Sequence, residues 1–173
     1  MALLRSLFAG LSLTINEGKS AVASAIGRKF PGSGFWEARG GEIKRKVADK
    51  PLGRFKQRVR QPTRRSRGRG MQQVVERLRP YLRGCKVYFG VAQSSTVWRE
   101  LDQGLRHRLR AIQLKQWRRG KTIHRELRAL GAKPGVARQV AANSRRCWRN
   151  SAMRPNSVLT LAWFDRLGRP RLS

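Results

Sequence analysis

The excess of positive charge is the feature that most restricts what this chain can fold into. Its 173 residues include 40 Lys or Arg and nine Asp or Glu, so the formal net charge at pH 7 is +31. Cations at this density repel one another and weaken a compact fold unless a polyanion neutralises them. Hydrophobic residues make up 39% of the chain, which permits a core of modest size. We therefore expect one domain or two small ones, acting on a polyanionic partner.

The type of cation indicates what that partner is. Thirty of the 40 basic residues are arginine, whose planar guanidinium makes paired hydrogen bonds to phosphate and stacks on bases. The charge is also clustered, within residues 39–69, 106–128 and 138–154. These clusters favour nucleic acid over an acidic protein. A basic helix on a membrane surface is the weaker alternative, because the clusters lack the wide apolar face that insertion requires.

Several other classes of protein are disfavoured by the sequence. It has no run of 18 apolar residues, and its start, MALLRSLFAGLSL, lacks a small-residue cleavage site, so we expect a cytoplasmic protein without a membrane partner. Cys85 and Cys147 cannot build a disulfide framework, and with His107 and His124 they form no zinc-binding spacing. We interpret both cysteines as core positions and expect no metal or cofactor.

The sequence also offers no catalytic group. Metal-dependent phosphoryl transfer needs converging carboxylates, yet the nine acids are scattered, and the closest pair, Glu100 and Asp102, would point to different faces of a helix. His107 lies between two arginines, where a solvated or phosphate-contacting role is expected. The string GKT at 120–122 is not a P-loop, because Lys115 occupies the position of the first glycine. We therefore expect no enzyme activity from the chain alone.

Hydrophobic patterning predicts strands only near the N-terminus. Alternating apolar residues at 11–15 and a second apolar run at 21–23 flank a turn, which predicts a pair of strands. A second hairpin is predicted over 34–46, around the turn at Gly40 and Gly41. The sequence becomes helical beyond residues 46–51.

Apolar residues at helical spacing predict the remaining elements. The expected helices are 52–61, 71–82 with Pro80 in the last turn, and 97–112 with a cap from Ser94 to Thr96. Shorter helices are expected over 122–130 with Thr122 as cap, from Pro134 onward, and over 158–167. An arginine-rich loop is expected between the first two. The fold class is thus mainly α with a small N-terminal β part.

Several strings of the sequence together resemble one family. They are LTINEGKSAV (13–22), GRKFPGSGFW (27–36), VERLRPYLRG (75–84), LDQGLRHRLR (101–110), KQWRRGKT (115–122), RELRALG (125–131) and ANSRRCWRNS (142–151). In this order they resemble the C-terminal half of bacterial group II intron reverse transcriptase/maturases. The resemblance implies that residues 1–46 are a remnant of the palm of the polymerase, 47–113 a helical thumb and 114–173 a small helical maturase-specific domain.

The same resemblance implies a role in RNA splicing. In that family the thumb and maturase domain clamp structured intron RNA, while the RNA performs its own transesterifications. The fingers and the palm aspartates are missing from this sequence, so no polymerase site is expected. Family members usually carry tryptophan where this chain has Cys85, Gly104 and Cys147, which suggests a decaying or truncated reading frame.

We expect RNA contacts from all three basic clusters. The candidates are Arg58, Arg60, Arg64, Arg65, Arg67, Arg69, Lys115, Trp117, Arg118, Arg119, Lys121, Arg145, Arg146, Trp148 and Arg149. The two indoles could stack on unpaired bases, although packing between helices is the commoner role of such residues. Two alternative functions are partnership with a separately encoded fingers and palm in a split polymerase, and general RNA binding of the ribosomal or chaperone type.

Overall fold

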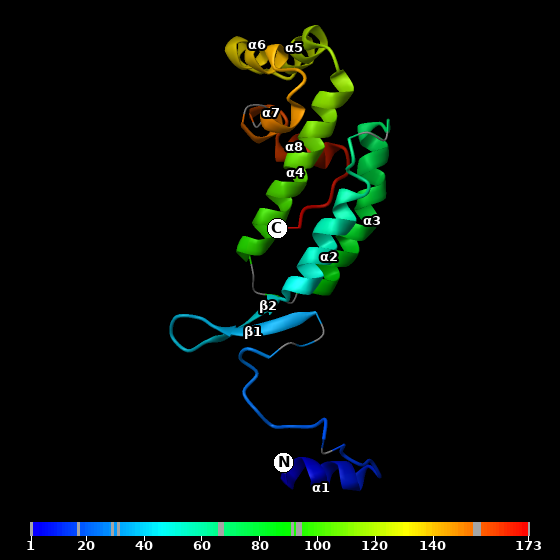
Figure 1. The fold of residues 1–173 in the computed structure, drawn as a ribbon, viewed down its shortest axis with the longest axis vertical. Coiled ribbons are helices and arrows are strands. Elements are labelled where there is room, and N and C mark those ends of the chain that lie inside the picture. Colours follow the sequence, from blue (N-terminus) through cyan, green and yellow to red (C-terminus); the bar gives the residue numbers. More distant parts are fainter. Residues whose placement is uncertain are drawn as a thin grey trace.

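Three long helices form the centre of the computed structural model: α2 (Asp49–Arg60), α3 (Met71–Phe89) and α4 (Ser95–Trp117). They lie side by side and give the molecule an elongated shape (Figure 1). The structure describes residues 2–16, 18–28, 30, 32–65, 68–90, 92, 95–153 and 157–172. The fold class is mainly α with a small N-terminal β part, so the expectation is confirmed.

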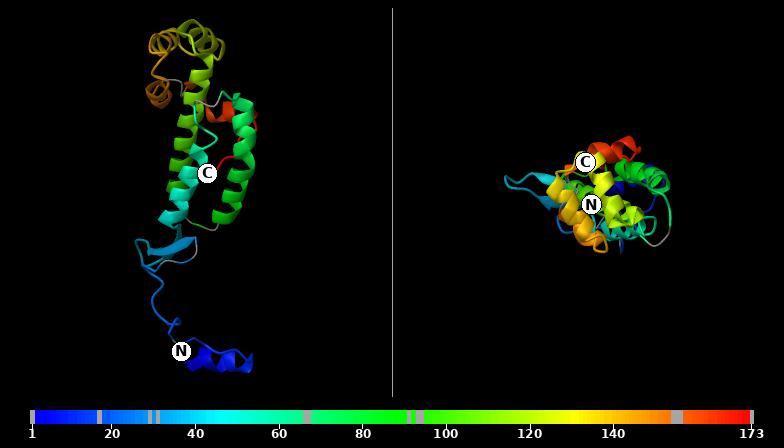
Figure 2. Two further views of the ribbon diagram at one scale, coloured as in Figure 1. Left: turned by 45° about the vertical axis from the view of Figure 1, so that its right-hand side comes forward. Right: turned by 90° about the horizontal axis from the view of Figure 1, so that it is seen from above.

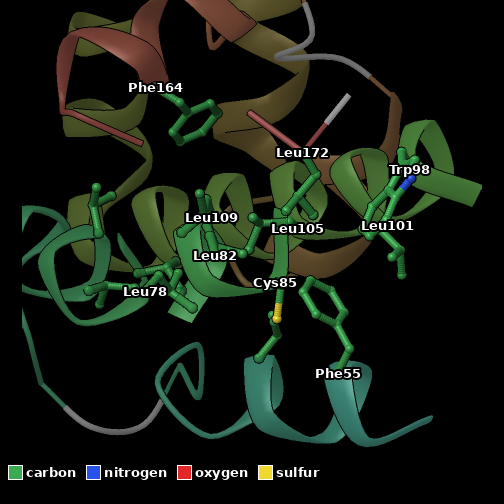
Figure 3. Close-up of a cluster of buried hydrophobic side chains, with 14 of the residues drawn as sticks. Phe55, Leu78, Leu82, Cys85, Trp98, Leu101, Leu105, Leu109, Phe164 and Leu172 are labelled. Atoms are coloured by element: carbon green, nitrogen blue, oxygen red, sulfur yellow. The ribbon is translucent and has the colours of Figure 1, made fainter. Parts of the chain in front are cut away.

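The apolar stripes of these helices meet in the larger of two cores. Phe55 from α2 packs with Leu78 and Leu82 from α3, and with Leu105 and its neighbours on α4 (Figure 3). Cys85 is buried in the same core and is a free thiol, which confirms its expected core position. The spacing of these residues by three or four positions gives each helix one continuous apolar face.

A smaller core holds the far end of α4 against three short helices. These are α5 (Gly120–Ala129), α6 (Pro134–Ala142) and α7 (Cys147–Met153). Leu114, Ile123, Leu127, Val140 and Cys147 are buried there. The pair α5–α6 covers one end of α4 in both side views (Figures 1 and 2). Cys147 is therefore also a core position, as expected.

The predicted hairpin is confirmed. Strand β1 (Ser33–Glu37) pairs antiparallel with β2 (Ile43–Val47), and Phe35 faces Arg45 in the register. Gly40 and Gly41 both adopt positive φ in the turn, a conformation that glycine adopts without steric cost. The second strand ends at Val47, whose side chain is buried in the larger core and so attaches the hairpin to the helices.

The strand pair expected over 11–23 is wrong. Residues 2–10 form helix α1 (Ala2–Gly10), and the described residues between it and Ile26 form no strand. Leu11 and Leu13 are exposed. These apolar side chains alternate with polar ones, but no neighbouring strand or core of the described residues covers them. An isolated pair of strands is only marginally stable in water. One isolated bridge joins Ile26 to Phe35.

Helix boundaries differ from the predictions in several places. Helix α3 continues through Pro80 to Phe89 because Leu82 and Cys85 extend its buried stripe. Helix α5 begins at Gly120, so Thr122 is not its cap. The last helix, α8 (Leu161–Arg166), starts three residues later than expected because the Thr160 side chain caps it. Ser94, part of the expected cap of α4, lies outside the described residues.

The C-terminal segment ties α3 to α4. Arg79 on α3 donates from Nε to the carbonyl of Gly168 over 2.9 Å. Arg169 is buried and its Nη1 lies 2.8 Å from Oδ1 of Asp102 on α4, which is also buried. The backbone N–H of Leu172 donates to the same carboxylate, and the Leu172 side chain enters the larger core (Figure 3). Residues 168–172 therefore belong to the fold.

Candidate nucleic-acid interface

A cationic hollow lies where the turn after α2, the middle of α4 and the start of α7 converge. Its volume is about 670 Å³. We call it the Trp148 site. The described residues that line it are Thr63, Arg64, Arg65, Arg108, Lys115, Arg145, Cys147 and Trp148. These residues include four arginines and one lysine but no carboxylate, so the site suits an anion.

Local packing holds the indole of Trp148 outward. Cys147 is buried in the smaller core and the Ser151 hydroxyl donates to the Trp148 carbonyl, so the next residue after Cys147 on the short helix faces solvent. The Trp148 side chain is 42% exposed. The ring of His107 from α4 packs against it with a centroid distance of 3.8 Å. The indole therefore has one supported face and remains accessible.

His107 also fixes the backbone of α7. Its Nε2 lies 2.9 Å from the Trp148 carbonyl oxygen. A carbonyl can only accept, so Nε2 carries the hydrogen in this contact. Thr63 is similarly engaged, since its buried hydroxyl donates to the Val59 carbonyl over 2.6 Å. These two contacts position the walls of the Trp148 site before any ligand arrives.

Two guanidinium groups flank the indole. The Cζ atoms of Arg65 and Arg108 lie 5.5 and 5.6 Å from the Trp148 ring centroid, within the range of a cation–π interaction. Burial, together with the nearby cations of Arg60 and Arg65, lowers the pKa of Arg108. The protonated side chain is therefore held in a partly desolvated position among like charges, and a bound phosphate would relieve this repulsion.

The structure brings six of the sequence-predicted residues together. Five of them line the Trp148 site, namely Arg64, Arg65, Lys115, Arg145 and Trp148. The sixth is Arg60, which is close enough to Arg108 to lower the pKa of Arg108. They come from all three basic clusters. The RNA contacts themselves stay predictions.

The other predicted residues lie elsewhere. Arg58, Arg118, Arg119, Lys121, Arg146 and Arg149 are exposed outside the lining of the site. The carbonyl of Arg69 accepts a hydrogen bond from Gln116 over 2.7 Å, beside the end of α4. Trp117 is half-buried and packs against both cores, so its indole joins the two bundles. Arg67 lies outside the described residues.

Arg108 is the main residue that the sequence did not single out. It was one of many basic residues in its cluster, and only its spacing could have distinguished it. Arg108 and Lys115 are seven positions apart, which places both on one face of α4. Leu105, Leu109 and Ile112 occupy the buried face of the same helix. A basic pair at this spacing beside an apolar stripe indicates a cationic face.

Neither a cluster of metal ligands nor a membrane-spanning helix is found among the described residues. No three His, Cys, Asp or Glu side chains among them gather as a metal site would require. Within the same part of the chain, no helix is both long and apolar enough to cross a membrane.

Comparison with known families identifies one segment. Residues 52–131 match the family described as "Group II intron, maturase-specific domain". No curated protein matches the chain. The matched segment begins in α2 and ends just after α5, so it spans the boundary expected between residues 113 and 114. The division into thumb and maturase domain stays a prediction.

Proposed function

Because residues 52–131 carry a group II intron maturase-specific domain, we propose that this chain is an RNA-binding C-terminal part of an intron maturase. It binds folded intron RNA and stabilises the active RNA fold during splicing, while the RNA supplies the chemistry. In this proposal the chain has no polymerase site of its own. Its cations lower the electrostatic cost of bringing RNA strands together.

The observation that carries this proposal is the Trp148 site. It combines an accessible indole with the guanidinium groups of Arg65 and Arg108, 5.5 and 5.6 Å from the ring centroid, in a hollow whose described lining is cationic. Aromatic faces bind unpaired bases, and guanidinium groups bind the neighbouring phosphates. Recognition of RNA relies on unpaired bases in loops and bulges more than on the edges of a duplex. The site therefore suits a folded RNA with exposed bases.

The test compares a site variant with a control of equal charge. The site variant is Arg65→Gln with Arg108→Gln, and the control is Arg77→Gln with Arg83→Gln, two exposed residues of α3. Filter binding would use a transcribed group II intron RNA and, separately, an RNA duplex. In the site variant, the slope of log affinity for intron RNA against log salt should fall by the equivalent of about two phosphate contacts. The variant should also lose the preference for intron RNA over the RNA duplex. The control should keep that preference.

Equal intron-RNA affinity and preference in the wild type and the site variant would overturn the proposal. Circular dichroism of both variants shows whether the helices remain intact. If the wild type binds both RNAs equally, general RNA binding of the chaperone type is favoured instead.

A second candidate, a subunit of a split RNA-directed DNA polymerase, is favoured by the apolar surface near the N-terminus. Helix α1 buries none of its residues, and Trp36, Ile43 and Phe30 are each 40% exposed or more. A separately encoded fingers and palm fragment would cover such a surface. Primer extension with and without that fragment tests this candidate, and extension by this chain alone would contradict both proposals.

A further inference from the structure

A second hollow lies on the other side of the contact between His107 and Trp148. It is bounded by α4, the end of α7, the start of α8 and the C-terminal segment, and has a volume of about 870 Å³. His107 lines this hollow, whereas Trp148 lines the first one. The two hollows share none of their described lining residues. We call the second one the Gly104 hollow.

The charge of the Gly104 hollow is positive. Arg106, Arg110 and Arg171 line it, with Glu100 as the one acid among the described lining residues. Arg171 is paired with Asp165. Arg106 lies within electrostatic range of the Asp102 and Asp165 carboxylates, but burial still lowers its pKa. Arg106 and Arg110 therefore remain as the cations that could serve a ligand.

Arg110 is built into the wall rather than lying on the surface. It is 8% exposed, and its Nε donates to the carbonyl of Leu159 over 2.9 Å, which fixes the plane of the guanidinium. Burial and the neighbouring cation of Arg106 lower the pKa of Arg110 to about 10. The side chain is still protonated at neutral pH, so the fold keeps a poorly solvated charge beside a like charge. An anion in the hollow would compensate for both.

The floor of the hollow is open at Gly104. This glycine lies inside α4, where glycine costs about 1 kcal/mol relative to alanine. A Cβ placed there would meet nothing within 4 Å, so packing within the chain does not require glycine. Glycine does permit a ligand to approach the helix backbone closely. The hydroxyl of Thr160 also lines the hollow. It accepts from the Trp163 N–H, and its own hydrogen can still be donated.

We propose that the Gly104 hollow is a second anion site, which binds a phosphate group through Arg106 and Arg110. The phosphate belongs either to an RNA strand or to a free nucleotide. If the phosphate belongs to RNA, the inference rests on the proposed function, and the chain would contact phosphate in one hollow on each side of α7. Binding of a free nucleotide does not depend on the proposed function.

The first experiment uses small phosphates and therefore does not need intron RNA. Isothermal titration of the full chain with pyrophosphate and with AMP, at low ionic strength, should show saturable binding. Arg106→Gln should weaken it at least tenfold. Gly104→Phe should do the same, because the ring fills the hollow while the open space around Gly104 spares the fold. The control Arg83→Gln should bind as the wild type does.

Wild-type affinity in both Arg106→Gln and Gly104→Phe, with both variants folded by circular dichroism, would overturn the proposal. So would the absence of saturable binding to the wild type. If Gly104→Phe only raises the melting temperature, the hollow is a packing gap and not a site.

Competition separates the two sources of phosphate. If the ligand is RNA, saturating intron RNA should displace pyrophosphate, and Arg106→Gln should weaken RNA binding while leaving the contacts of Trp148 intact. If the ligand is a free nucleotide, RNA should leave pyrophosphate binding unchanged. Failure of intron RNA to bind at all would contradict the proposed function and would leave the pyrophosphate result standing.

Discussion

At the scale of single residues, Trp148 connects the fold to the proposed recognition of RNA. Its indole packs against His107 and lines the hollow, where it is partly exposed. Stacking of a base on an aromatic ring contributes about 1–3 kcal/mol. We expect Trp148→Ala to weaken binding of intron RNA about tenfold or more and Trp148→Phe to retain part of the affinity, measured by filter binding.

Trp36 provides a matched control for that prediction. It is 41% exposed, nearly the same as Trp148, but lies on the β1–β2 hairpin. Trp36→Ala should leave the affinity for intron RNA unchanged. An equal loss in both variants would show that Trp148 has no special role.

The half-buried phenol of Tyr81 makes stability depend on alkaline pH. Tyr81 stacks on Phe55, and burial together with a hydrogen bond to Cys85 raises its pKa to about 12. An unfolded tyrosine titrates near pH 10, so the neutral phenol stabilises the fold fully below pH 10, and this contribution is lost as pH rises toward 12. The urea midpoint of the wild type should therefore fall more steeply over this range than that of Tyr81→Phe. If the urea midpoints of the wild type and of Tyr81→Phe fall in parallel with pH, the raised pKa of Tyr81 is contradicted.

At the scale of elements, the C-terminal segment depends on the buried pair of Asp102 and Arg169. Asp102→Asn would leave the buried Arg169 guanidinium with only the more distant Asp165 carboxylate, 4.0 Å from Nη2. Removing one partner of a buried pair costs about 3–5 kcal/mol. Chemical denaturation should show this loss. Glu126→Gln removes the exposed pair with Arg125 and should cost less than about 1 kcal/mol.

A double variant keeps this prediction testable if Asp102→Asn does not fold. Asp102→Leu with Arg169→Met removes both buried charges, and such replacements are often neutral or stabilising. We expect it to recover most of the helical signal in circular dichroism. A stable Asp102→Asn protein, within about 1 kcal/mol of the wild type, would show that the segment does not hold α3 and α4 together.

Elements were predictable from the sequence where they carry a long apolar stripe. The stripes of α2, α3 and α4 and the glycine turn of the hairpin were found because local chemistry determines them. The prediction of a strand pair over 11–23 was wrong. Alternating apolar and polar residues show which side of a strand would be buried, but not whether another element covers that side. Helix α7 was missed because its seven residues are too short for a periodic pattern.

At the scale of the whole molecule, the sequence predicted an RNA-binding surface but not its arrangement. The Trp148 site combines a turn near residue 64, the middle of α4 and the start of α7. Contacts between such distant segments depend on how the two cores pack around Trp117, and no local pattern encodes that packing. The match to the maturase-specific domain supports the resemblance for residues 52–131.

The net charge of +31 leads to the most direct test of the account. If the cationic surface contacts about 6–10 phosphates, affinity for intron RNA should fall by about 10³–10⁵ between 50 and 200 mM salt. The measurement is a filter-binding titration of the full chain over that range. A linear decline of log affinity with log salt, of that size, is the predicted result. Affinity that barely changes with salt, or no binding at 50 mM, would contradict the claim that this chain neutralises a folded RNA.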